Sequence, residues 1–173
     1  MSRFINSYSL FLEGSGYWDM IPLLIRLHHL FYDNEWEMVI YHDRSDLCSL
    51  QYGKALIEMN EEKLIRLIYV NETPLLCKAM LWRMKPIWES DSEYTFCRDA
   101  DSLLTARQRF CVQEFINSGK CVNGINDNRY HDIPLMGGMI GFKNKSFISN
   151  TNVKSLDELY NLVNFTNEKW LSR

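Results

Sequence analysis

The hydrophobic pattern of the chain alternates between short apolar runs and segments with helical spacing. Apolar and β-branched runs predict strands over Phe4–Leu12, Glu37–Tyr41, Leu64–Val70 and Tyr94–Arg98. Between them, apolar residues that recur every three or four positions predict four helices, over Tyr17–Phe31, Leu47–Met59, Leu75–Trp88 and Thr105–Asn117. The first two-thirds of the chain are therefore expected to alternate strictly between strands and helices.

The last third follows a different pattern. Cys121–Asp127 and Met136–Lys143 look extended, and a polar loop separates them. Helical alternation is expected to stop after Gly119, which has the position of a helix-ending glycine. Ser155 and Glu158 have capping-box spacing and predict one final helix.

Such alternation predicts an α/β fold, with a mostly parallel central sheet and helices on both faces. In these sheets, ligands bind beyond the carboxyl ends of the strands. The first strand, the second strand with His42 and Asp43, and the fourth strand with Asp99 and Asp101 would all end at that edge. A ligand site is therefore expected there.

Composition limits the class of protein. The chain has 173 residues, 46% hydrophobic and 24% charged, which predicts a single globular domain over 1–173. A net charge of -3 without a lysine or arginine block gives no support to a nucleic-acid partner. The longest apolar run, Met20–Ile25, is too short to span a membrane, and no signal-peptide pattern opens the chain. The five cysteines lack metal-ligand spacing and predict reduced, mostly buried thiols, so a cytoplasmic protein is expected.

Two aspartates, Asp99 and Asp101, directly follow the predicted Tyr94–Arg98 strand. Carboxylates at the end of a buried strand cost free energy unless a positive group lies between them. Mg²⁺ and Mn²⁺ suit this position, because they take hard oxygen ligands, often one or two carboxylates plus substrate phosphates. The alternative is that Asp99 only caps the following helix.

Three basic residues lie near the aspartates in the sequence. Arg98 precedes them, and Arg83 and Lys85 belong to the preceding predicted helix. These cations are candidates for binding a diphosphate, because arginine holds phosphate in a two-pronged fork. The alternatives are solvation or an ion pair with the aspartates themselves. Arg83 continues an otherwise apolar stripe, so it needs an anionic partner of one kind or the other.

Two adjacent glycines, Gly137 and Gly138, open the second extended segment of the last third. They indicate a close approach of the backbone to a ligand, with a β-bulge as the alternative.

Several motifs resemble those of one glycosyltransferase group in order and spacing. They are Leu81-Trp82-Arg83-Met84-Lys85-Pro86, Phe96-Cys97-Arg98-Asp99-Ala100-Asp101-Ser102, Asp127-Asn128-Arg129-Tyr130-His131 and Met136-Gly137-Gly138-Met139-Ile140-Gly141. Ser7-Tyr8-Ser9-Leu10-Phe11 and Tyr41-His42-Asp43 are also similar. The group is metal-dependent, has the GT-A fold, and includes bacterial surface-polysaccharide and large-DNA-virus enzymes.

The resemblance implies transfer of a sugar, of the hexosyltransferase type, from a nucleoside diphosphate donor to a hydroxyl of a glycan or glycoprotein acceptor. It implies that Asp101 ligates Mn²⁺ or Mg²⁺, and that Asp99 touches the metal or the donor ribose. The Gly137-Gly138 loop would face the donor sugar. Asp127 is the candidate base that deprotonates the acceptor. His131 is a candidate base, metal ligand or acceptor contact, or is simply solvated.

Two further interpretations remain open. Members of the group continue past the Gly-Gly strand into a segment with an Asp-Gln pair, and no such segment is predicted before Arg173. Without that usual C-terminal segment, the domain could be a catalytically silent nucleotide-sugar-binding module that needs a partner domain. The other interpretation is a metal-dependent nucleotidyltransferase, for which the same kind of fold is expected. Such an enzyme would ordinarily have a basic Gly-rich loop after the first strand. Gly14-Ser15-Gly16 has no nearby lysine or arginine before Arg26.

Overall fold

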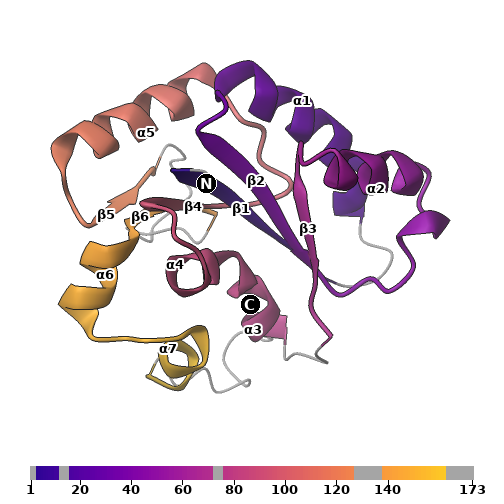
Figure 1. Cartoon of the computed structure of the whole chain (residues 1–173). Helices are drawn as coiled ribbons and strands as arrows, with labels where there is room; N and C mark the ends of the chain where they lie inside the picture. Colours follow the sequence, from indigo (N-terminus) through magenta and orange to yellow (C-terminus); the bar gives the residue numbers. More distant parts are fainter. Residues whose placement is uncertain (1–2, 12–15, 72–75, 127–137, 163–173) are drawn as a thin grey trace.

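The structure, a computed structural model, describes residues 3–11, 16–71, 76–126 and 138–162. A six-stranded sheet runs through the middle of the molecule in the order β3-β2-β1-β4-β6-β5 (Figure 1). The strands are β1 (Phe4–Leu10), β2 (Trp36–His42), β3 (Arg66–Tyr69), β4 (Tyr94–Arg98), β5 (Val122–Gly124) and β6 (Met139–Lys143). The first four are mutually parallel, and β6 and β5 add an antiparallel extension beside β4.

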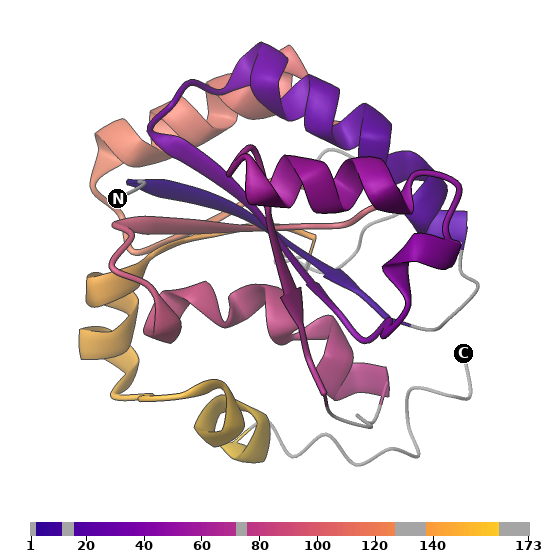
Figure 2. The same cartoon turned by 45° about the vertical axis from the view of Figure 1, so that its right-hand side comes forward.

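Helices cover both faces of this sheet, as the alternation predicts (Figures 1 and 2). One face carries the 3₁₀ helix η1 (Gly16–Met20), α1 (Ile21–Phe31), α2 (Gly53–Glu61) and α5 (Ala106–Ser118), with η2 (Leu47–Ser49) leading into α2. The other face carries α3 (Leu76–Met80), η3 (Trp82–Met84), α4 (Pro86–Glu89), α6 (Asn144–Thr151) and α7 (Leu156–Leu162). The predicted α/β fold with a mostly parallel sheet is confirmed.

The core has two layers because successive side chains of a strand point to opposite faces. Along β1, Tyr8 and Leu10 pack with residues of α1, whereas Ile5 packs with Trp82 on the other side. All four side chains are at most 1% exposed. β1 is therefore the centre of both layers, and its carboxyl end is held rigidly.

The helix after β4 begins and ends where the sequence predicts. The hydroxyl of Thr105 accepts a hydrogen bond from the Gln108 N–H at 3.2 Å, and the Gln108 side chain accepts one from the Thr105 N–H at 3.3 Å. Gly119 ends the helix in the left-handed region at φ 67°, where a side chain would be unfavourable. Thr105 is thus the N-cap of α5, and the alternative role of Asp99 as its cap is wrong.

The single helix expected over Leu75–Trp88 is divided into three short pieces. The Arg83 N–H donates to the Ser9 hydroxyl at 2.8 Å instead of to the α-helical carbonyl four residues back. Met84 and Lys85 then make 3₁₀ bonds to Leu81 and Trp82. Pro86, which lacks an N–H, starts α4 in its first turn.

Helix α6 was missed by the sequence pattern, which predicted no helix between β6 and Ser155. Its residues are mostly asparagine, serine and threonine, which are weak helix formers. Packing compensates, because Phe147 lies edge-on to Trp88 and Phe142 with ring centroids 6.2 and 4.9 Å away. The final helix has its predicted cap, since the Ser155 hydroxyl accepts from the Glu158 N–H at 3.1 Å.

The cysteines are less buried than expected. Cys97 is buried, Cys111 and Cys121 are half-buried, and Cys48 is exposed on η2. The expectation of mostly buried thiols is therefore wrong for these positions, because cysteine burial depends on the face that each element presents. None of the described helices combines the length and the apolar character needed to cross a bilayer.

Candidate functional site

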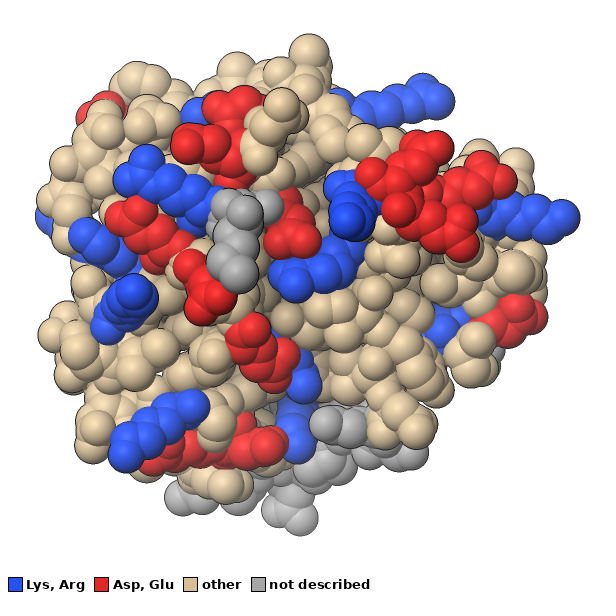
Figure 3. Space-filling view, in the orientation of Figure 1, with Lys and Arg blue, Asp and Glu red and all other residues tan. Residues whose placement is uncertain are grey.

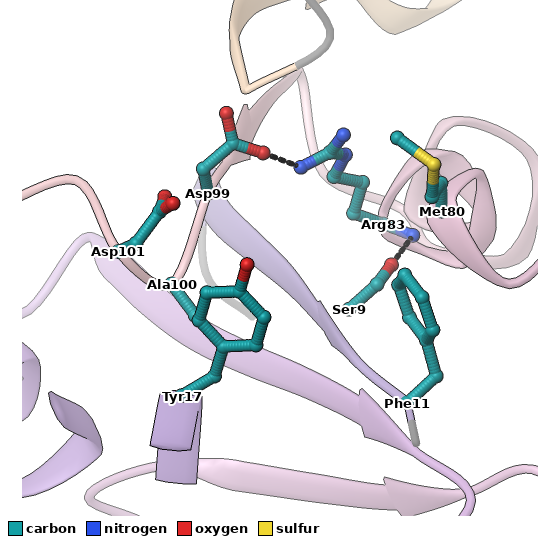
Figure 4. Close-up of a pocket in the computed structure, with 8 residues that line it drawn as sticks. All are labelled: Ser9, Phe11, Tyr17, Met80, Arg83, Asp99, Ala100 and Asp101. Carbon is teal, nitrogen blue, oxygen red and sulfur yellow. Dashed lines mark hydrogen bonds and ion pairs between the residues drawn. The ribbon is translucent and has the colours of Figure 1, made fainter. Parts of the chain in front are cut away.

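A pocket of about 230 Å³ lies at the carboxyl edge of β1 and β4. The two strands run parallel with Tyr8 beside Arg98, so their following residues reach the same edge. Eight residues line the pocket: Ser9, Phe11, Tyr17, Met80, Arg83, Asp99, Ala100 and Asp101 (Figure 4). The aspartate pair thus lies at the edge where the fold rule predicts a ligand.

Arg83 reaches this edge from η3. Its side chain is 9% exposed, and its Nη1 forms an ion pair with Asp99 Oδ1 and donates to the Arg98 carbonyl at 3.1 Å. The predicted need of Arg83 for an anionic partner is therefore met by Asp99. The backbone is fixed as well, through the Arg83 N–H bond to Ser9.

Cys97 contacts the backbone of Arg83 through its thiol. Burial raises the pKa of its thiol to about 12, so the thiol stays protonated. Its Sγ donates to the Arg83 carbonyl at 3.5 Å. Cys97 is consequently a structural donor beneath the pocket.

Asp101 enters the pocket from the turn after β4. It is exposed, and it lies across from Arg83 in the close-up (Figure 4). Within the described part of the chain, its carboxylate has no ion-pair partner. The two aspartates therefore differ, because Asp99 is already paired and Asp101 is open to a ligand.

Gly138 lies directly against the carboxylate of Asp99. A methyl group placed on its Cα would overlap both carboxylate oxygens and Cγ of Asp99. Glycine is therefore needed at this position because the backbone approaches the Asp99 side chain. The sequence predicted a close approach to a ligand, or a β-bulge, instead.

The structure separates other candidates from this pocket. The Arg98 guanidinium is buried on the opposite face of the sheet, where it donates to Asn6 at 3.0 Å and to the Tyr32 hydroxyl at 3.1 Å. Lys85 forms an ion pair with Glu89 at 3.5 Å. Neither residue lines the pocket, so their predicted contact with a donor gains no support from their placement. The candidates Asp127, His131 and Gly137 lie outside the described residues.

Five lining residues were not candidate site residues in the sequence: Ser9, Phe11, Tyr17, Met80 and Ala100. Tyr17 is 47% exposed and Met80 43% exposed, so both side chains are accessible to a ligand. An aromatic residue straight after the Gly14-Ser15-Gly16 sequence is the signal that could have identified Tyr17. Phe11, Tyr17 and Met80 form the apolar wall of the pocket, which lies beside its charged groups (Figure 4).

The donor set fits a hard divalent cation. Asp99 and Asp101 offer carboxylate oxygens at one pocket, and the described residues contain no cluster of three or more His, Cys, Asp or Glu side chains. Mg²⁺ and Mn²⁺ are commonly held by one or two carboxylates together with substrate phosphates and water. The residues present thus suit a metal that arrives with, or is completed by, a phosphate ligand.

On the face displayed in Figure 3, acidic and basic side chains are interspersed. That face therefore offers no uniformly basic surface. Recognition of an anion at the pocket would therefore depend on individual basic side chains. Arg83 is a buried side chain of this kind that lines the pocket.

Comparison with known proteins shows the fold. No family model and no curated protein matches the sequence. The chain is similar to the mannosyltransferase PcManGT from Pyrobaculum calidifontis, solved in complex with GDP-Man and Mn²⁺, with a TM-score of 0.57 and 13% identity over 90% of this chain and 50% of that one. It is similar to the apo form of the glycosyltransferase GlyE from Streptococcus pneumoniae TIGR4, with a TM-score of 0.60 and 10% identity over 97% of this chain and 40% of that one.

A third similar structure is TarS from S. aureus, with a TM-score of 0.57 and 12% identity over 92% of this chain and 54% of that one. The chain thus spans about half the length of these proteins or less. The fold is GT-A-like, which confirms the fold expected from the motifs. At such low identity the likeness concerns the fold.

Proposed function

We propose that the chain is a glycosyltransferase domain that transfers a sugar from a nucleoside diphosphate donor to an acceptor hydroxyl. The observation that carries the proposal is the pocket at the carboxyl edge of β1 and β4, where Asp99, Asp101 and Arg83 meet. A GT-A-like fold supports it, because two of the similar structures are named as a mannosyltransferase and a glycosyltransferase.

Asp101, with Asp99 beside it, would hold Mn²⁺ or Mg²⁺. When bound, the cation would offset the negative charge that develops on the leaving diphosphate. Arg83 would bind the diphosphate, since its backbone N–H donates to the Ser9 hydroxyl, its guanidinium donates to the Arg98 carbonyl, and its side chain lines the pocket.

The apolar wall would hold the less charged part of the donor. Phe11, Tyr17 and Met80 offer aromatic and thioether surface next to the charged groups. A nucleotide sugar has this same division into a planar base, a diphosphate and a sugar, so the apolar wall and the charged groups would both be used. Asp127 remains the predicted base for the acceptor hydroxyl, with His131 as the second candidate.

The decisive experiment is a donor panel that includes GDP-mannose and other nucleotide sugars, with Mn²⁺ or with EDTA. Binding is measured by calorimetric titration, and slow donor hydrolysis by release of the nucleoside diphosphate. Metal-enhanced binding with hydrolysis of at least one donor is the expected result. Absence of metal-enhanced binding for every donor would overturn the proposal, and binding without turnover, even with acceptors supplied, would instead indicate a silent binding module.

A further inference from the structure

The two opposite charges of the pocket neutralise each other in the ligand-free chain. Asp99 Oδ1 is paired with Arg83 Nη1, and Gly138 lies against the rest of the same carboxylate. The carboxylate that would face a cation and the guanidinium that would face a diphosphate are thus each other's partners. Asp101 stands outside this pair in the same pocket.

Arg83 is the fixed member of the pair. Its side chain is 9% exposed, and its N–H and Nη1 also donate to Ser9 and to the Arg98 carbonyl. The Asp99 side chain is 40% exposed and ends at the pocket. Separation of the pair would therefore be a movement of the carboxylate rather than of the guanidinium.

We propose that the Arg83–Asp99 ion pair is a latch that makes the site selective for a metal together with a diphosphate, over either one alone. The inference rests on the proposed function and adds a role to it. A diphosphate that takes Arg83 leaves Asp99 without its cation, and a metal that takes Asp99 leaves a buried guanidinium without its anion. Only the two ligands together give each member of the pair a new partner.

The latch predicts coupling between two binding events. Each ligand that binds alone has to separate the pair, whereas the second ligand finds the pair already open. The coupling is reciprocal, so the metal tightens diphosphate binding by the same factor as the diphosphate tightens metal binding. Direct bridging of metal and phosphate adds to this coupling in any such site, and variants are needed to separate the two sources.

The first test measures binding of a nucleoside diphosphate in EDTA, with GDP and UDP as the probes. Asp99→Asn removes the carboxylate's charge and leaves Arg83 open, so affinity should rise about fivefold or more over the wild type. Asp101→Asn is the matched control, because it removes the same charge from the same pocket without touching the latch. A clearly smaller gain for Asp101→Asn supports the latch, and equal gains for both variants would overturn it.

The second test measures binding of Mn²⁺ alone, through the electron paramagnetic resonance signal of the free ion. Arg83→Met keeps an apolar stem at the buried position and should raise Mn²⁺ affinity, because Asp99 is released. The same substitution in an Asp99→Asn background should give a distinctly smaller gain. Equal gains in the two backgrounds would mean that only the lost positive charge matters, and the latch would be wrong.

The outcomes separate this inference from the proposed function. If no nucleoside diphosphate corresponding to the donor panel, GDP and UDP included, binds the wild type even with Mn²⁺, the proposed function fails. If one binds with Mn²⁺ but the Asp99→Asn and Asp101→Asn variants behave alike, the latch alone fails. Should Arg83→Met not fold, as judged by its thermal transition, the comparison of the two aspartate variants decides the question, because both alter accessible side chains.

Discussion

Gly138 lies against the carboxylate of Asp99 at a place where no side chain fits. The glycine directly precedes β6, and the aspartate directly follows β4, which pairs with β6 in antiparallel register from Arg98 and Met139 onward. The close approach is thus a product of the strand pairing that extends the parallel sheet. It holds one end of the carboxylate while Arg83 holds the other.

Gly138→Ala should weaken metal-dependent donor binding by about tenfold, because the new methyl group displaces the Asp99 carboxylate from the pocket. Calorimetric titration of donor with Mn²⁺ measures the change. Gly16→Ala is the control, since a methyl group at Gly16, next to Tyr17, meets no atom within 4 Å. Unchanged donor affinity in Gly138→Ala would show that the position of Asp99 does not matter for binding.

Asp101→Ala should abolish Mn²⁺-dependent donor binding and leave thermal stability nearly unchanged. Its side chain is exposed, and its removal relieves repulsion between two carboxylates. Asp91→Ala, which removes an exposed carboxylate far from this pocket, should change neither property. If Asp101→Ala unfolds and the wild type binds no metal, Asp101 has a structural role instead.

Two central strands, β2 and β4, could be predicted because burial on both faces leaves a mostly apolar run of residues. Tyr94–Arg98 is predicted to the residue, since five buried positions in a row precede two aspartates. Helix α6 could not be predicted, because its stability depends on Phe147 meeting Trp88, and no local preference of its sequence encodes that contact.

The site could be located from the sequence but not divided into its parts. The motif makes both Asp99 and Asp101 candidates for contact with the metal, yet only the fold shows that Arg83 pairs with Asp99. Likewise, Arg98 adjoins the aspartates in sequence, but strand alternation turns its side chain to the opposite face. Arg83, which is distant from the aspartates in the sequence, therefore lies beside them in the fold. Arg98, which adjoins them in the sequence, points away from the pocket.

Tyr17→Phe should lower donor affinity several-fold without changing thermal stability. The hydroxyl of Tyr17 points toward the aspartates across the pocket (Figure 4), and the ring is 47% exposed, so the fold depends little on it. One lost hydrogen bond corresponds to about 0.5–1.5 kcal/mol, which is a factor of about two to ten in affinity. Tyr52→Phe, a similarly exposed tyrosine elsewhere, serves as the control. If Tyr17→Phe and the wild type bind the donor with equal affinity, the hydroxyl does not contact the donor. Tyr17 would then contribute only its ring to the pocket lining.

Arg98→Met should cost about 2 kcal/mol of stability, because Asn6 and Tyr32 each lose a buried charged donor. In a chain of this size, the melting temperature should fall by about 4–8 °C. Donor affinity of the folded variant should stay within about twofold of the wild type, which calorimetric titration at low temperature would measure. Arg26→Met, at an exposed position of α1, is the control for stability. A large loss of donor affinity would restore Arg98 as a donor-binding residue.

The buried imidazole of His28 should make stability depend on pH. Burial, and then the nearby charges of His29 and Arg98, lower the pKa of His28 to about 4. Its Nδ1 lies 3.3 Å from the Asn6 amide, and a neutral ring can accept that hydrogen bond. An unfolded histidine has a pKa of about 6.5, so between these two values the unfolded chain binds more protons than the folded one.

Stability should therefore be complete above about pH 6.5 and fall as the pH drops toward 4, by about 2–3 kcal/mol for this one residue. Urea unfolding near pH 7 and near pH 5 would measure the change. His28→Gln should be less stable near pH 7 yet lose less stability on acidification, because no imidazole has to be charged. His29→Gln should reduce the acid loss only in part, since burial of His28 remains while the second cause of its lowered pKa, the charge of His29, is removed. His42, whose pKa burial also lowers, contributes with the same sign and remains in every variant. An acid loss in His28→Gln as large as in the wild type would mean that other groups, carboxylates among them, govern the pH dependence.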